Sequence, residues 1–276
     1  MIADVRLFPH HRASAVASAV TPRVWCFVLG GGSRQQSPAL LRALGRAARL
    51  APAHRVVAIL ARESRSSSPL ADTADVATIV QPAYRGSAAE LFLPTLLVAR
   101  RDPDAVIVAL RADQVFDGPV APSLARAIEA VAQRAGLTVL VGARPRTARV
   151  PDGLVEPGLP VPGLEHLALH AVRRFVYEAP RGLAAHALVA PAALAARADA
   201  LVELGRRYIP EVLETLEPLE DVADKPEATL LCEAVYECMP YASLSRELLQ
   251  RVPDLAVLPV PDVLRETGDA VARLAS

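Results

Sequence analysis

Residues Arg23–Arg34 read RVWCFVLGGGSR, and the rest of the chain can be interpreted around them. Val24–Leu29 is short, apolar and rich in aromatic and β-branched residues, and glycines follow it directly, so it predicts a buried strand. A strand that is apolar on both faces is typical of a parallel sheet covered by helices. Backbone N–H groups in a glycine turn after such a strand can approach an anion closely. Gly30, Gly31 and Gly32 are therefore candidates for a phosphate-binding loop, and a plain strand-to-helix turn is the alternative.

The composition limits the classes of function. The chain has 276 residues, of which 52% are hydrophobic, which is enough for one large α/β domain or two small ones. Lys+Arg and Asp+Glu balance at 30 each and aromatic residues make up 4%, so we expect neither nucleic acid nor a membrane as a partner. Three cysteines without zinc spacing, no signal peptide and no bilayer-spanning run predict a cytoplasmic protein.

Strands and helices are predicted to alternate over residues 23–141. After the strand at 24–29, strands are expected at 55–60, 76–80, 105–110 and 137–141, and the helices between them at 38–50, 87–101 and 122–135. This alternation predicts an α/β fold with a doubly wound, mostly parallel mixed central sheet and helices on both faces. Residues 1–22 are expected to be a poorly ordered extension, and residues 23–276 a single domain.

The pattern is less regular from residue 142 to residue 276. Strands are expected at 171–177 and 255–260, and the apolar residues 183–190 are ambiguous. Pro191 suits a first helical turn, so residues 192–216 are predicted to be helical, with breaks at Gly205 and Pro210. Further helices are expected at 227–237, 243–251 and 269–274.

Polar residues follow two of the predicted strands. Ser87 is placed to cap the helix at 87–101, with Glu90 closing a capping box. Arg85 either pairs with Glu90 on the helix surface or contacts a ligand. Asp113 follows the strand at 105–110, where a carboxylate either holds a metal ion or caps a turn.

Six segments, in order along the chain, resemble the sugar-1-phosphate nucleotidylyltransferases, and most closely the mannose-1-phosphate guanylyltransferase branch. The segments are Val28–Gly32 (VLGGG), Gln81–Ala88 (QPAYRGSA), Asp102–Gln114 (DPDAVIVALRADQ), Val155–Gly158 (VEPG), Val172–Pro180 (VRRFVYEAP), and Leu244–Arg246 with Leu255–Val260. The resemblance implies a Rossmann-like nucleotide-diphospho-sugar transferase fold. It also divides the domain into a nucleotide-binding half, 23–141, and a sugar-binding half, 142–276.

The resemblance implies transfer of a nucleotidyl group from a nucleoside triphosphate to a sugar 1-phosphate, with GTP and mannose 1-phosphate favoured. A sugar phosphate oxygen attacks the α-phosphorus, pyrophosphate leaves, and Mg²⁺ and basic side chains neutralise charge. By resemblance, the nucleotide contacts are Gly30, Gly31, Gly32, Arg85, Gly86 and Ser87, the sugar contact is Glu178, the metal ligands are Asp113 and Glu266, and the catalytic residues are Arg34 and Asp113.

The chain departs from the family pattern at charged positions. The segment that follows the family's glycines and brings an arginine and a lysine to the triphosphate is missing, so Arg34 is the candidate substitute. Lys225 is the only lysine in the chain, and Ala179 replaces the sugar-phosphate lysine. Glu266 stands where the family has its second metal-binding aspartate. The alternative for Glu178 is a solvated strand end, and for Glu266 it is an exposed acidic loop.

Two functions therefore remain open on the sequence, besides a purely structural partner protein with a vestigial pocket. The first is nucleotidyl transfer with Mg²⁺. The second is a catalytically inactive paralogue that binds a nucleotide or nucleotide sugar and regulates an active relative. A homodimer, or a complex with that active paralogue, is the expected assembly.

Overall fold

The computed structural model describes residues 22–31, 37–62, 76–116, 120–145, 153–177, 187–223, 225 and 227–266. Its strands are β1 (Val24–Leu29), β2 (Val56–Ala61), β3 (Ala77–Gln81), β4 (Val106–Arg111), β5 (Gln114–Phe116), β6 (Thr138–Pro145), β7 (Leu154–Pro160), β8 (His170–Val176), β9 (Leu188–Arg197) and β10 (Leu255–Glu266). Its α-helices are α1 (Ser37–Ala47), α3 (Ser87–Ala99), α4 (Ala121–Gln133), α5 (Ala198–Tyr208), α6 (Pro210–Leu216) and α7 (Ala228–Cys238). A single π-helical segment, η5 (Leu244–Leu249), and short 3₁₀ turns complete the described elements.

The first half of the chain forms the parallel sheet that the sequence predicts. The strand order here is β3-β2-β1-β4, and each neighbouring pair is parallel. β1 lies between β2 and β4, with Leu29 opposite both Ile59 and Arg111 in the register. The carboxyl ends of β1 and β4 therefore lie side by side at one edge of the sheet, the edge at which ligands bind in open α/β sheets.

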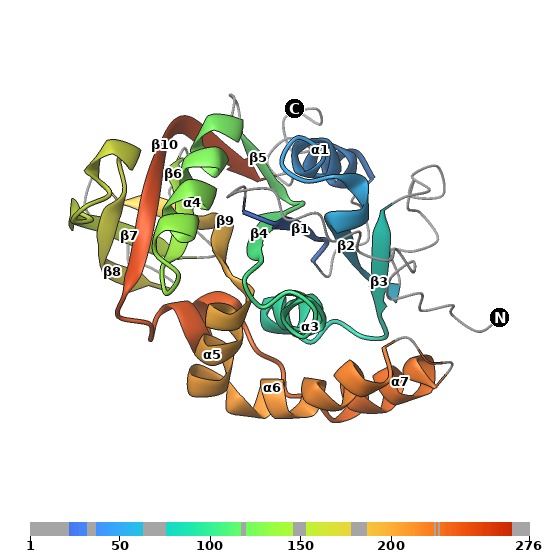
Figure 1. Ribbon diagram of the computed structural model, residues 1–276. Coiled ribbons are helices and arrows are strands. Elements are labelled where there is room, and N and C mark those ends of the chain that lie inside the picture. Colours follow the sequence, from blue (N-terminus) through green and yellow to red (C-terminus); the bar gives the residue numbers. More distant parts are fainter. Residues whose placement is uncertain are drawn as a thin grey trace, which may run out of the picture.

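The second half makes the sheet mixed, as expected, but the expectation that most of its pairs are parallel was wrong there. β9 is antiparallel to both β4 and β6, whereas β6 and β10 are parallel. β7 pairs with β8 and also with β9, so β9, β6, β10, β8 and β7 form a closed ring. The same ten-stranded sheet runs through both expected halves of the chain (Figure 1).

One predicted helix begins too early. Residues 192–197 belong to β9, and α5 begins only at Ala198, so Pro191 lies in a strand and not in a first helical turn. The alanine-rich sequence favours a helix by intrinsic propensity. However, Leu194 and Ala195 are buried between β4 and β6, and the backbone pairing there overrides that propensity.

Helices cover both faces of the sheet, as predicted. α1 and α4 lie on one face, and α3 with α5, α6 and α7 lies on the other (Figure 1). The side chains of β1 alternate between the two cores: Phe27 and Leu29 pack toward α3, whereas Cys26 and Val28 pack toward α1. This alternation explains why the strand is apolar at every position.

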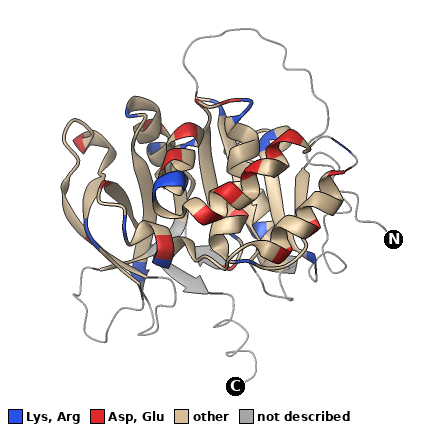
Figure 2. Cartoon of the chain, turned by 90° about the horizontal axis from the view of Figure 1, so that it is seen from below, with Lys and Arg blue, Asp and Glu red and all other residues tan. Residues whose placement is uncertain are grey.

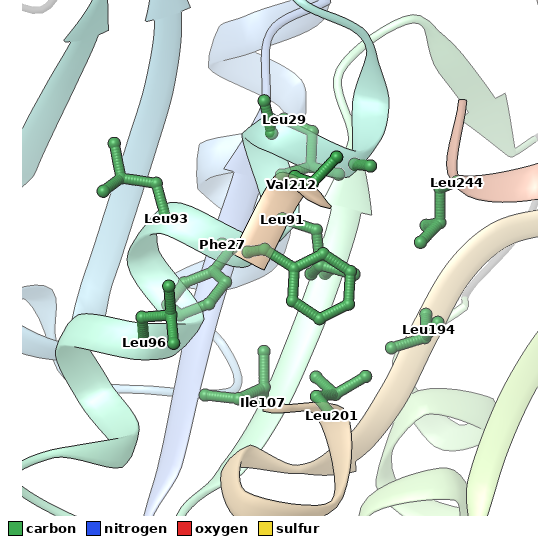
Figure 3. Close-up of a cluster of buried hydrophobic side chains, with 14 of the residues drawn as sticks. Phe27, Leu29, Leu91, Leu93, Leu96, Ile107, Leu194, Leu201, Val212 and Leu244 are labelled. Carbon is green, nitrogen blue, oxygen red and sulfur yellow. The ribbon is translucent and has the colours of Figure 1, made fainter. Parts of the chain in front are cut away.

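α3 is the central helix of its layer. All its residues from Ala88 to Val98 are buried, because the sheet covers one side and α5 and α6 cover the other. Leu91 and Leu96 meet Phe27 and Ile107 from the sheet in one apolar cluster, and Leu201 of α5 reaches the same cluster (Figure 3). α3 is therefore held in a fixed position relative to the end of β1.

No helix in the described part of the chain is long and apolar enough to cross a bilayer.

Gly205 does not break the helix, contrary to the sequence prediction, because α5 continues through it to Tyr208. It marks instead a close contact between helices. A Cβ at Gly205 would lie 2.6 Å from both Leu213 Cδ2 of α6 and Phe92 Cε1 of α3.

Gly205→Ala is expected to lower the free energy of unfolding by about 1–3 kcal/mol, because the added methyl overpacks the contact between α5, α6 and α3. Gly45→Ala in α1 is the matched control: nothing lies within 4 Å of its Cβ position, and it should be neutral or stabilising by up to about 1 kcal/mol. Urea unfolding of both variants checks this. Equal stabilities would contradict the close-packing interpretation.

Candidate functional site

The ends of β1 and β4 meet at the site that the sequence predicts. The Ala112 N–H donates to the Leu29 carbonyl over 2.9 Å, and the Gly30 N–H donates to the Ile59 carbonyl over 2.8 Å. Gly31 and Asp113 therefore extend beyond two adjacent strands. Gly31 has φ of 67°, in the left-handed region that favours glycine. The Gly30 N–H is already used within the sheet, so within the described part of the loop the Gly31 N–H is the donor that extends beyond the sheet.

A buried carboxylate accepts the hydrogen bond of the Gly31 N–H. Glu90, in the first turn of α3, accepts a hydrogen bond from the Gly31 N–H at 2.7 Å, and Glu90 is only 2% exposed. Burial raises the pKa of Glu90 from 4.5 to about 7, although the Gly31 N–H and the charge of Arg111 act in the opposite direction. The protein's own anion thus lies where a ligand phosphate was expected.

An arginine holds the expected metal ligand. Arg111 Nε donates to Asp113 Oδ1 at 3.0 Å, and Arg111 Nη2 donates to Asp113 Oδ2. Both carboxylate oxygens of Asp113 therefore face a guanidinium. The partners are partly exposed, with side-chain exposures of 25% for Arg111 and 41% for Asp113. The cation beside Asp113 is therefore the side chain of Arg111.

The described side chains include one of the two expected metal ligands, Asp113, and a Mg²⁺ ion that bridges phosphates needs only one or two carboxylates from the protein. Among them, no group of three or more His, Cys, Asp or Glu residues could hold a metal. The backbone of Glu266 is opposite Gln114 at the end of β10, so it reaches the same edge of the sheet as Asp113. The side chain of Glu266 is outside the described part of the structure. Its role as a second ligand stays a prediction.

Arg85 contacts the end of a helix. Its Nε donates to the Tyr236 carbonyl at 2.6 Å, and its Nη2 donates to the Glu237 carbonyl at 3.0 Å. These are among the last carbonyls of α7, which have no partner within the helix, and a cation is favourable at that end. The expected surface pair with Glu90 was therefore wrong, because Glu90 is buried against Gly31.

Ser87 is the first residue of α3 and does not cap it. Gly86 stands at the N-cap without a side-chain cap bond, and the capping box with Glu90 was therefore wrong. The Ser87 Oγ instead accepts from the Leu244 N–H at 2.9 Å, at the start of the π-helical segment.

Gly86 is required by a close backbone contact. It has φ of 92°, and a Cβ there would lie 2.1 Å from the Ala242 carbonyl oxygen. The Ala88 N–H donates to this oxygen, and the Ala242 N–H donates to the Arg85 carbonyl, each at 3.1 Å. Two side-chain contacts add to this: Gln81 Nε2 donates to Tyr236 Oη at 2.9 Å, and the rings of Tyr84 and Tyr241 meet edge to face at 6.1 Å.

We refer to these two segments, residues 81–88 and 236–244, as the clasp. Arg85, Gly86 and Ser87 were expected to contact a nucleotide. In the clasp, the guanidinium of Arg85 and the hydroxyl of Ser87 instead bind backbone groups of residues 236–244, and Gly86 lies against the Ala242 carbonyl. Nothing near residues 81–88 in the sequence signals this use, because the partner segment lies about 150 residues away.

Two residues of the site were missed from the sequence, although each had a signal. Glu90 is the one charged residue within the buried stretch 88–98, which indicates a buried carboxylate. Arg111 and Asp113 are two apart at a strand end, a spacing that places side chains on the same side. Gly32, Arg34 and Glu178 lie outside the described residues, so their assigned roles stay predictions.

Charged residues of both signs are interspersed over the side of the molecule seen from below (Figure 2).

No family model matches the chain, and no curated protein sequence matches it. Solved structures do match it. A mannose-1-phosphate geranyltransferase from Thermus thermophilus superposes with a TM-score of 0.75 at 22% identity, over 92% of this chain and 79% of that one. A mannose-6-phosphate isomerase from Helicobacter pylori has a TM-score of 0.67 at 12% identity, over 88% of this chain and 100% of that one.

A UTP-bound UGPase from Acinetobacter baumannii superposes more weakly, with a TM-score of 0.52 at 13% identity over 92% of each chain. At these identities the likeness establishes the fold: the chain has the mixed α/β architecture of these sugar-phosphate and nucleotide proteins.

Replacing Glu90 should change how stability depends on pH. Its pKa in the folded protein, about 7, exceeds the usual 4.5, so the folded state binds this proton more tightly than the unfolded state. The contribution of this proton to the free energy of unfolding is fully present below about pH 4.5 and is lost as the pH rises through 7. It amounts to about 3 kcal/mol. Glu90→Gln should therefore become more stable than the wild type toward about pH 8. Urea unfolding across this range checks it, and parallel curves would contradict a buried, titrating carboxyl.

Gly86→Ala should lower the free energy of unfolding by about 2–4 kcal/mol, because the added Cβ meets the Ala242 carbonyl in the clasp and the positive φ is strained. Gly136→Ala is the control, since nothing lies within 4 Å of its Cβ position. Thermal unfolding compares the two. A Gly86→Ala variant as stable as the control would refute the close approach of residues 86 and 242.

Proposed function

We propose that this protein binds the ligands of the sugar-1-phosphate nucleotidylyltransferases, a nucleotide or a nucleotide sugar, at the edge where β1 and β4 end. The observation that carries the proposal is the placement of Gly31 and Asp113 beyond two adjacent parallel strands. Ligands of open α/β sheets lie at such edges. The fold supports the same ligand class, because one structure of this fold is named as UTP-bound and another as complexed with UDP-glucose.

Two functions are compatible with this ligand class. The first is transfer of a nucleotidyl group from GTP to mannose 1-phosphate: a phosphate oxygen of the sugar attacks the α-phosphorus, and the bond to the leaving pyrophosphate breaks. The second is binding of a nucleotide or nucleotide sugar without turnover, as a regulatory partner of an active paralogue.

The geometry favours binding without turnover. Phosphoryl and nucleotidyl transfer depend on preorganised cations at the reacting phosphates. Here Arg111 is held by Asp113, the carboxylate that would carry Mg²⁺ in the transfer reaction. Lys225, the single lysine of the chain, lies in the turn before α7. The described residues therefore supply few of the charges that transfer requires.

We expect GTP or GDP-mannose to raise the melting temperature of the full chain by a few degrees, because a ligand that binds the native state stabilises it. We expect pyrophosphate release from GTP and mannose 1-phosphate with Mg²⁺ to stay at the level of a protein-free control.

Pyrophosphate release that Asp113→Asn abolishes would instead identify the protein as a transferase. The absence of any melting shift with GTP, UTP, mannose 1-phosphate or GDP-mannose would contradict both functions.

A further inference from the structure

Glu90 is the side chain that accepts the hydrogen bond of the Gly31 N–H. We propose that Glu90 sets the charge selectivity of the glycine turn, because its carboxylate occupies the Gly31 N–H and excludes anionic groups of a ligand from it. The inference rests on the proposed function because it concerns the same edge of the sheet, where β1 and β4 end. It adds the residue that decides which groups of a ligand can bind the Gly31 N–H.

The hydrogen bond itself is specific. Glu90 Oε1 lies 2.7 Å from the Gly31 nitrogen, a short distance for an N–H···O bond, and the side chain is almost fully buried. A phosphate oxygen that binds Gly31 must take the same N–H, so the two acceptors compete. Because α3 is buried from Ala88 to Val98, the helix cannot rotate to withdraw Glu90 without disrupting the core.

Charge adds to this competition. The groups that act on Glu90 are Arg111 and Asp113 at the end of β4, Tyr84 before α3, and Tyr236 of α7. Arg111 is the cation among them, and it is already paired with Asp113. Burial raises the pKa values of both tyrosines, and a tyrosine is neutral or anionic but never a cation, so neither compensates an added anion. A phosphate at Gly31 would therefore face a carboxylate whose neighbouring cation, Arg111, is shared with Asp113.

The protonation state of Glu90 should modulate this exclusion. With a pKa of about 7, the carboxyl is largely ionised at about pH 8 and largely neutral at about pH 6. The turn should therefore reject polyphosphate above neutrality and tolerate it better below.

A series of variants separates two effects of Glu90: its negative charge, and its occupation of the Gly31 N–H. Glu90→Gln keeps an acceptor oxygen for Gly31 but removes the charge, and Glu90→Ala removes both. The matched control is Glu203→Gln on the exposed surface of α5. Calorimetric titration of the full chain with inorganic pyrophosphate, and separately with GTP, is done at about pH 6 and about pH 8.

At about pH 8, we expect the affinity for pyrophosphate to rise from wild type to Glu90→Gln by about tenfold or more, and to rise further in Glu90→Ala. We expect the gain from Glu90→Gln to shrink at about pH 6, and Glu203→Gln to match the wild type. A ligand-free readout accompanies this: the amide NMR signal of Gly31 should titrate near neutral pH in the wild type and not in Glu90→Gln.

Two results would overturn the inference: a wild type that binds pyrophosphate and GTP as tightly as Glu90→Ala at both pH values, or a Gly31 signal that titrates identically in wild type and Glu90→Gln. The first of these leaves the proposed function standing, since GTP still binds. A Glu90→Ala variant that gains affinity for pyrophosphate while no variant binds a nucleotide or nucleotide sugar supports the inference and contradicts the proposed function.

Discussion

The burial of β1 on both faces is the constraint on which the rest of the structure depends. Phe27 and Leu29 pack against the layer of α3, and Cys26 and Val28 pack against the layer of α1, so the strand cannot shift without moving both cores. Its neighbours β2 and β4 are fixed in register by backbone pairing. The end of β1 is therefore held rigidly beside the end of β4, and a buried α3 brings Glu90 to the same point.

At this edge, the charged groups of the site pair with other groups of the same chain. Glu90 supplies an anion to the Gly31 N–H, and Arg111 supplies a cation to Asp113. The clasp uses the polar groups of residues 85–87 to bind residues 236–244. Gly31, Arg85, Ser87 and Asp113, which would contact a ligand phosphate, metal ion or base in the nucleotidylyltransferase interpretation, thus each have a partner within the chain.

Much of the fold could be predicted from sequence, because apolar periodicity reports burial directly. Val24–Leu29 and residues 105–110 are runs that only a sheet covered on both faces can bury, and both strands were predicted correctly. The end of β9 was not predicted correctly. The alanines at 192–196 have a helical propensity, which pairing with β4 and β6 overrides. The neighbouring placement of Gly31 and Asp113 followed from the parallel topology.

The sequence by itself determined the layered architecture, the apolar core and the position of the candidate site, because these depend on local pattern and on the rule that parallel strands end together. Tertiary structure alone decided what the polar residues of the site contact. Glu90, Arg85 and Ser87 each had a plausible local role in helix capping or surface pairing, and each instead binds a backbone group from a distant segment. Hydrogen bonds of this kind form between residues 59 to 157 positions apart. Such partners are set by packing and leave no periodic signal in the chain.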